Sequence, residues 1–456
     1  MSFTLCRDGA SALACGVLLL SSLARVEAQG QVREASVRAH MDMLAGDALN
    51  GRGSGTRDEW LAASYVASQL RQWGIEPAYG ATSLVREIAT DRVELTAPPT
   101  LRTGALAFSH GREMVVRSFG TPGASGPLVR FLPGTRVAPG SVILVVGPDG
   151  PPADVSAGAV AVIEAETPEL RLSWAASAAA TSVAAPAGRP WRIVVNAAAF
   201  LALARVADGS TVTLEAITRP GRTWNVVGSI PGRDRRQAGE VILLSAHLDH
   251  LGSRGSAADT VYNGADDDAS GVTAVLEIAR ALAQGRPPRR TVMFAFFGSE
   301  EAGGFGSRAF VASPPVPLGQ IVANLQFEMI GRPDAAVAAR TLWLTGFERS
   351  TLGRELVRRG ARLVADPHPD QQFFFRSDNI RFAYAGVVAH TVSSFGLHED
   401  YHSPRDEVAR VDFGHMIDAI ESLLAPIAWL ANSTFVPAWH EGQQPKAGER
   451  PGRPVR

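Results

Sequence analysis

The stretch NGADDDASGVTAVLEIARAL, which begins at Asn263, carries acidic residues whose spacing permits two incompatible structures. Counted from Asp266, the stretch fits a calcium-binding loop with Gly271 at its turn position. The oxygen ligands at loop positions one, three, five and twelve would be Asp266, Asp268, Ser270 and Glu277. In the second interpretation, Asp267 is one carboxylate at a turn between a strand and a helix, and it faces a different partner.

The residues on either side of this stretch argue against a calcium loop, which needs a helix on each flank. Upstream, residues 251–265 are rich in Gly, Ser and Asp and show no helical apolar period. Downstream, apolar residues recur at three- and four-residue steps from Val272 to Leu282, so a helix already occupies the second half of the loop. We therefore interpret Asp268 and Ser270 as caps of that helix.

Other potential metal ligands follow apolar runs of the kind that form buried strands. The segments that carry them are His247-Leu248-Asp249-His250 after VILLSA, Glu300-Glu301 after TVMFAFFGS, Glu328 after VANLQF, and His398, Tyr401 and His402 after GVVAHTVSSFG. Each residue taken singly is more often structural than functional. Because the carboxyl ends of parallel strands meet at one edge of a sheet, we expect these side chains to enter a common crevice.

The residue types in this set match the requirements of a pair of zinc ions. Two ions about 3.5 to 4 Å apart need a short bridging carboxylate, and Asp267 at a helix start suits that role. Each ion then needs one imidazole and one further carboxylate. His247 with Glu328, and His402 with Glu301, supply these pairs.

The same segments also offer a general base. Successive side chains of an extended segment point to opposite sides, so Glu300 can face a substrate while Glu301 binds metal. Glu300 would take a proton from a zinc-activated water and deliver it to the leaving amine. Asp249, two residues after His247, is placed to orient that imidazole.

The composition of the chain agrees with a metal centre built from His, Asp and Glu. Both cysteines lie within residues 1–28, which carry an apolar stretch and the small-residue cleavage site Val26-Glu27-Ala28 of a secretion signal. We therefore expect a secreted protein, periplasmic or extracellular, whose mature chain has no thiol and no membrane anchor. With 44 basic and 45 acidic residues, nothing directs the chain towards nucleic acid.

The elements that must position the site are predicted as an α/β domain with a mostly parallel sheet. Apolar runs alternate with helical patterns from residue 219, and the expected strands are 240–246, 290–298, 321–329 and 385–392. Residues 56–74 predict an amphipathic helix. We assign residues 29–90 and 219–434 to the catalytic domain, 91–218 to an inserted β-rich domain, and 435–456 to a disordered tail rich in Pro, Gly and charge.

These motifs resemble the successive blocks of metallopeptidase family 28, which contains di-zinc aminopeptidases and glutamate carboxypeptidases. The matching blocks are AHLDHLG, NGADDDASG, FFGSEEAGGFGSRAF, LQFEMIG, SDNIRFAYAGVVA and HEDYHSPRDE. The resemblance covers most of Thr223 to Asp412 and implies a zinc-exopeptidase fold with two zinc ions. The insertion resembles a protease-associated domain more faintly.

The resemblance also implies a role for each site residue. The metal positions fall on His247, Asp267, Glu301, Glu328 and His402. Glu300 falls on the general base and Asp249 on the orienting acid, and Tyr401 falls on a tyrosine that steadies an oxyanion in some members. Two residues depart from the common pattern, because many members have Asp in place of Glu328 and His in place of Asn379. Neither change removes a ligand.

The function expected from the sequence is that of a secreted zinc aminopeptidase acting on peptides. The aromatic run 373–375 could form a wall that favours apolar N-terminal residues. A carboxypeptidase on the same metals is the main alternative, and Arg376 or Arg381 would then hold the terminal carboxylate. A single-zinc glutaminyl cyclase typically lacks the first histidine, which is present as His247. A non-catalytic binding homologue would show broken ligand positions, and none is broken.

Overall fold

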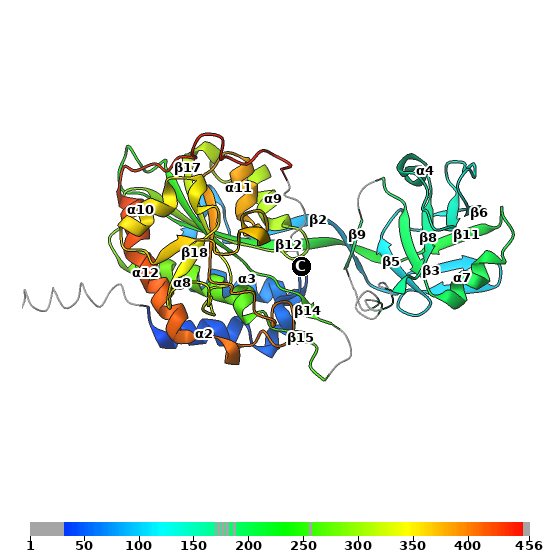
Figure 1. Cartoon of the computed structure of the whole chain (residues 1–456), viewed down its shortest axis with the longest axis horizontal. Helices are drawn as coiled ribbons and strands as arrows, with labels where there is room; N and C mark the ends of the chain where they lie inside the picture. The colour runs from blue at the N-terminus through cyan, green and yellow to red at the C-terminus, as the bar shows by residue number, and fades with distance from the viewer. Residues whose placement is uncertain are drawn as a thin grey trace, which may run out of the picture. The chain divides into compact units, whose positions relative to one another are not determined.

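The computed structural model describes residues 32–168, 171, 174, 178, 182–185, 188–254 and 258–449, which form two compact units (Figure 1). Within that range, the first unit comprises residues 32–86, 224–252 and 262–449. The second comprises residues 87–223 and 253–261, apart from the gaps just given. The predicted secretion signal lies outside the described residues. No helix in the described part of the chain is long and apolar enough to cross a membrane.

A mixed sheet with a parallel centre forms the middle layer of the first unit. Strand β13 (Val241–His247) pairs in parallel with β16 (Thr291–Phe297) and β17 (Ile321–Phe327), and β17 pairs in parallel with β20 (Ala389–Ser393). The antiparallel or peripheral strands are β1 (Glu76–Pro77), β12 (Thr218–Ile230), β18 (Leu342–Leu344) and β19 (Leu363–Ala365). The predicted α/β fold with a mostly parallel sheet is therefore confirmed.

Helices cover both faces of this sheet, as Figure 1 shows. Ile242, Leu244 and Ala246 of β13 belong to the core shared with α2 (Glu34–Leu44), α3 (Arg57–Gln72), α8 (Gly271–Gln284) and α12 (Phe413–Asn432). The alternate residues Val241 and Leu243 pack in a second core with α9 (Phe305–Ala312) and α11 (Asn379–Tyr384). Helix α10 (Leu352–Arg358) completes the unit. Every residue of β13 and β16 is buried, as expected for strands covered on both faces.

The start of α3 illustrates how local sequence sets an element. The Thr56 side chain accepts hydrogen bonds from the backbone N–H groups of Asp58 and Glu59, which caps the helix. Ala62, Val66 and Leu70 form its buried face. This helix was predicted for residues 56–74, and it ends within two residues of that range.

The second unit is mainly β-sheet around its own apolar core. Its elements are β2 (Val85–Leu95), β3 (Thr100–Thr103), β4 (Leu106–Ser109), β5 (Met114–Ser118), β6 (Ser125–Phe131), β7 (Val142–Val145), α4 (Ala153–Ala157), β8 (Ala161–Ala165), β9 (Ser182–Ala184), β10 (Trp191–Val195), α7 (Ala197–Ala204) and β11 (Thr211–Glu215). A separate two-stranded sheet consists of β14 (Gly252–Ser253) and β15 (Val261–Tyr262). Strands β2 and β12 run through the predicted boundaries at 91 and 218, so the unit begins and ends slightly outside them.

The prediction of a disordered tail is wrong for residues 435–449. Ala438 accepts a hydrogen bond from the Thr351 backbone N–H at 3.0 Å. The Trp439 ring lies 5.3 Å from the His390 ring and 6.2 Å from the Phe374 ring. Composition alone suggested disorder, but aromatic contacts hold this segment against the first unit. Residues 450–456 lie outside the described range.

Candidate metal centre

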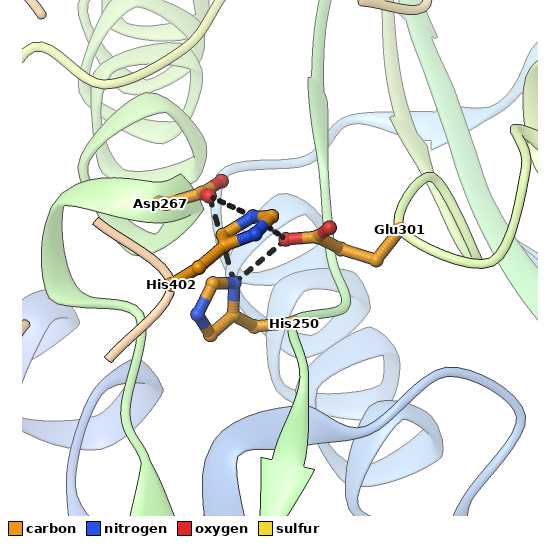
Figure 2. Close-up of side chains that lie close together, drawn as sticks. All are labelled: His250, Asp267, Glu301 and His402. Carbon is orange, nitrogen blue, oxygen red and sulfur yellow. Dashed lines mark hydrogen bonds and ion pairs between the residues drawn. The ribbon is translucent and has the colours of Figure 1, made fainter. Parts of the chain in front are cut away.

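Two groups of potential metal ligands meet at the carboxyl edge of the central sheet and share one carboxylate. The first group is His247, Asp267 and Glu328. The second is His250, Asp267, Glu301 and His402, which Figure 2 shows. In each group one ligand atom from every residue lies within 4.8 Å of all the others. The structure thus brings together all five predicted ligands and adds His250.

The ends of three parallel strands explain why these side chains converge. His247 is the last residue of β13, Glu300 and Glu301 follow β16, and Glu328 follows β17 directly. His402 lies in the long segment after β20. Because these strands run in the same direction, their carboxyl ends lie at one edge of the sheet.

Asp267 faces two different imidazoles with its two oxygens. Its Oδ1 lies 3.2 Å from Nε2 of His247, and its Oδ2 lies 3.3 Å from Nε2 of His402. The residue precedes α8 and is only 3% exposed. The neighbouring imidazoles lower the pKa of Asp267 well below its ordinary value in spite of burial. This is the geometry of a carboxylate that joins two ligand groups.

The backbone carbonyl of Asp249 holds the His247 ring. Nδ1 of His247 lies 3.1 Å from that carbonyl oxygen, which can only accept a hydrogen bond. Nδ1 therefore carries a proton, and Nε2 is the ring atom left to bind a metal beside Asp267. In spite of burial, the charges of Asp268, Asp267 and Glu300 raise the pKa of His247 well above its ordinary value.

The carboxylate of Asp249 has a contact that the sequence did not predict. It accepts hydrogen bonds from the backbone N–H groups of Glu300 at 2.8 Å and Glu301 at 3.2 Å, and from the hydroxyl of Ser54. Its Oδ1 is 3.8 Å from Nδ1 of His247, longer than the carbonyl contact. Asp249 therefore positions the Glu300–Glu301 segment as well as the imidazole.

Glu300 and Glu328 lie in a strongly acidic environment. Burial raises the pKa of Glu300 well above its ordinary value, and the charges of Asp378, Glu328 and Glu301 add to the shift. Burial likewise raises the pKa of Glu328 to about 7, and the hydroxyl of Ser377 donates a hydrogen bond to its Oε2. Both carboxyls hold a proton more tightly than an exposed Glu does, unless a cation is close.

The carboxylates of Asp267, Glu300, Glu301 and Glu328 line a pocket that also has aromatic side chains in its wall. Trp343, Phe373 and Phe395 line it, with the guanidinium of Arg376 at 4.9 Å from the centre of the Phe373 ring. Of the three phenylalanines 373–375, only Phe373 lines the pocket. Arg381 is not among the lining residues.

Tyr401 also lines the pocket and stacks on a candidate ligand. Its ring lies 3.8 Å from the His402 ring, with 22° between the planes. Burial raises the pKa of the Tyr401 hydroxyl, and the nearby carboxylates of Asp267 and Glu301 add to this shift. The hydroxyl therefore stays protonated and remains a hydrogen-bond donor.

The remaining acids of the Asp-rich stretch are structural. Asp268 caps α8, because its carboxylate accepts from the backbone N–H of Gly271 at 3.1 Å. Ser270 was predicted as a cap as well, but its hydroxyl donates to the backbone oxygen of Asp266 at 2.7 Å. Asp266 pairs at 3.0 Å with Nε2 of His398, which is therefore absent from both ligand groups.

Glu277 rules out the calcium-loop alternative. Its carboxylate accepts hydrogen bonds from Arg280 at 2.7 Å and from Ser36 at 2.6 Å, so α2 and α8 share it. Asn379, which departs from the family pattern, is also structural. It donates to the Phe374 carbonyl at 3.1 Å and accepts from the Thr391 hydroxyl at 3.0 Å.

Arg52 supports the backbone that carries the site, and the sequence did not predict this role. Its guanidinium is 1% exposed and donates to the backbone oxygens of Leu248 at 2.9 Å, Asn263 at 2.7 Å and Gly264 at 3.0 Å. It thereby ties the segment after β13 to the segment that carries Asp267. The sequence signal is weak, since one arginine in an Asn-Gly-Arg-Gly turn resembles any exposed loop residue.

One ligand and two neighbours of ligands have strained backbones. Ser299, Met329 and His402 have φ values of 53°, 53° and 54°, in the left-handed region that non-glycine residues seldom adopt. Ser299 precedes Glu300, and Met329 follows Glu328. Such conformations cluster at functional sites, where the surrounding fold enforces them.

Comparison with known proteins links this geometry to peptidases. Residues 225–427 match the family model described as peptidase family M28. Leupeptin-inactivating enzyme 1 of Streptomyces exfoliatus is 34% identical over 131 residues, 28% of this chain and 27% of the relative. The probable lipoprotein aminopeptidase LpqL of Mycobacterium tuberculosis is 28% identical over 334 residues, 68% of this chain and 61% of the relative. The chain thus spans less than two thirds of either relative.

A solved structure shares the fold. The zinc aminopeptidase BSAP from Bacillus subtilis aligns with a TM-score of 0.56 at 18% identity, covering 88% of this chain and 96% of that protein. At this identity the likeness concerns the fold alone.

Proposed function

Residues 225–427 belong to peptidase family M28, and from this premise we propose that the protein is a zinc aminopeptidase that removes apolar residues from the free N-terminus of peptides. The observation that carries the proposal is the placement of Asp267 between His247 and His402, beside Glu300 and an aromatic pocket. We also propose that the protein is secreted, on the strength of residues 1–28.

The residues of the site fit two zinc ions. Nε2 of His247 and Nδ1 of His250 are buried and have no hydrogen-bond partner within the described residues. Buried polar atoms without a partner are uncommon, and imidazole and carboxylate are ligands that zinc accepts. No described Lys or Arg pairs with Asp267, Glu301 or Glu328, so these negative charges call for cations from outside the chain.

The side chains then divide the work of peptide hydrolysis. Bound zinc supplies Lewis acidity and lowers the pKa of water to about 7. Glu300 accepts the proton at its carboxylate and passes it to the departing amine. The Asp249 carboxylate accepts a hydrogen bond from the backbone N–H of Glu300 and so holds Glu300 in position. The Tyr401 hydroxyl, which stays protonated, can donate to the carbonyl oxygen of the substrate as negative charge develops there.

The pocket suits a peptide with a free amine and an apolar first residue. Trp343, Phe373 and Phe395 offer an apolar surface, and the carboxylates that line the same pocket favour a protonated amine. One observation favours a carboxypeptidase instead, because the guanidinium of Arg376 lines the pocket beside the Phe373 ring. A single guanidinium among several carboxylates is a weaker attraction for a terminal carboxylate than the carboxylates are for an amine.

The deciding experiment compares leucine p-nitroanilide, its N-acetylated form, and an N-blocked dipeptide with a free C-terminus. We expect hydrolysis of the first and loss of more than about 100-fold when the amine is blocked, because a charge-assisted contact is lost. Faster hydrolysis of the N-blocked dipeptide would establish the carboxypeptidase alternative. Arg376→Ala should then abolish it, while the matched variant Arg381→Ala, outside the pocket lining, should not.

A further inference from the structure

We propose that His250 is a fourth protein ligand at one of the two metal positions, so that the centre is asymmetric. One position has four protein donors, from His250, Asp267, Glu301 and His402. The other has three, from His247, Asp267 and Glu328. This inference rests on the proposed zinc centre and assigns a role to a residue that the sequence prediction left without one.

The distances between the four donors match one zinc coordination shell (Figure 2). Nδ1 of His250 lies 2.9 Å from Oε1 of Glu301 and 3.7 Å from Oδ2 of Asp267. Nε2 of His402 lies 3.1 Å and 3.3 Å from the same two oxygens. Tetrahedral zinc with bonds of about 2.0 to 2.2 Å separates neighbouring donors by roughly 3.3 to 3.6 Å. The four measured distances bracket that range.

His250 makes no hydrogen bond that would explain its position otherwise. The residue is 1% exposed, and within the described residues neither ring nitrogen has a hydrogen-bond partner. The 2.9 Å contact with Glu301 therefore lacks the direction of a hydrogen bond, as expected when both atoms point at a third centre. A buried imidazole without a partner is costly unless something else binds it.

The surrounding backbone is shaped to hold this ring. A Cβ atom at Gly264 would lie 2.6 Å from Cγ of His250, so only glycine leaves room for the imidazole there. Gly264 also has a φ of 60°, which glycine adopts without strain. On the other side, the backbone N–H of His250 donates to the carbonyl of Arg52 at 3.0 Å. The ring is thus fixed in place before any ion binds.

The unequal donor sets predict unequal affinities. Structural zinc sites are closed by four protein ligands, whereas catalytic sites have three and stay open to water or substrate. The position with His250 should therefore fill first and empty last. The position with His247 and Glu328 should exchange its ion more readily.

The test uses the full chain, stripped of metal and titrated with zinc, with cobalt as a spectroscopic probe. In wild type we expect two ions of different affinity, and zinc X-ray absorption should report three imidazoles for two ions. His250→Asn and His250→Leu should weaken the tighter position by more than about 100-fold, beyond the effect of an outer hydrogen-bond partner. Both should lower the imidazole count to two and change the cobalt spectrum of that position.

A matched control and the outcomes below distinguish a failure of the proposed role of His250 from a failure of the proposed function. His40→Gln alters another buried histidine, which contacts the Tyr65 hydroxyl at 2.8 Å, and should leave both affinities and the imidazole count unchanged. Two imidazoles in wild type, or unaltered binding and spectra in both His250 variants, would overturn the role of His250 alone. A wild-type chain that binds no zinc would contradict the proposed function itself.

Discussion

Asp267 and Glu277 are two buried carboxylates of one chain segment, and only Glu277 has an arginine partner among the described residues. Glu277 is fully buried and pairs with Arg280 at 2.7 Å, and hydrogen bonds from His40, Arg280 and Ser36 lower its pKa to about 2 despite burial. Asp267 is almost as buried, yet it faces imidazoles and, beyond them, further carboxylates. Glu277 is therefore a structural acid, whereas Asp267 is placed to bind a ligand.

The physical reason lies in the cost of burying charge. A buried carboxylate stays ionised only if a cation or several hydrogen bonds compensate for the lost water. Around Glu277 the chain provides that compensation. Around Asp267 the described residues supply no Lys or Arg partner, only imidazoles, and the neighbouring acids raise the pKa of His247 and His402. The buried Arg52 donates its hydrogen bonds to backbone oxygens. Metal ions bound in place of the imidazole protons would balance the whole group of acids.

The largest effect should come from removing the shared carboxylate. Asp267→Ala takes a ligand from both groups, so we expect near-complete loss of zinc and a fall in turnover beyond the roughly 10⁴-fold limit for a general base. Metal analysis of the purified variant checks this. If the variant keeps both ions, Asp267 is not the bridge and the comparison with Glu277 fails.

Glu300→Gln should separate metal binding from proton transfer. The amide keeps the size of the side chain but cannot accept the proton, so turnover should fall about 10²- to 10⁴-fold. Zinc content should be unchanged, since Glu300 belongs to neither ligand group. Steady-state kinetics on the zinc-loaded variant decide the question. Wild-type turnover in that preparation would move the base assignment to another residue.

The smallest functional effect should come from Glu277→Gln, which tests the structural acid. Its pKa is depressed in the folded chain, so its stabilisation is complete above the ordinary value of 4.5 and is lost as pH falls towards about 2. We expect a loss of stability on the order of 2 kcal/mol at pH 7, with normal zinc content and kcat. Denaturant unfolding of both proteins should show this difference constant from pH 7 to 5 and shrinking below about 4.5. A variant that loses zinc would place Glu277 in the metal site.

Much of the site could be predicted because strand ends determine it. The apolar runs that form β13, β16 and β17 are clear in the sequence. These strands bring His247, Glu301 and Glu328 to one edge of the sheet independently of the conformation of the loops. The helical period after Gly271 likewise excluded the calcium loop, and the position of Glu277 agrees.

The parts that could not be predicted depend on side-chain direction in irregular segments. His250 lies three residues beyond His247, and only the fold of the turn and the space left by Gly264 aim its ring at Glu301. The direction of the Asp249 side chain is equally hard to predict, because its carboxylate contacts Glu300 in the loop that follows β16. Residues 435–449 look disordered by composition, because the contacts of Trp439 are with distant segments that composition does not register.

The zinc content of the wild-type protein tests the central claim most directly. The measurement is zinc per chain in the purified protein, together with peptide hydrolysis before and after treatment with a chelator. The account predicts close to two zinc ions per chain, loss of hydrolysis on chelation, and recovery on adding zinc or cobalt. A preparation that hydrolyses peptides at full rate with no bound transition metal would contradict it.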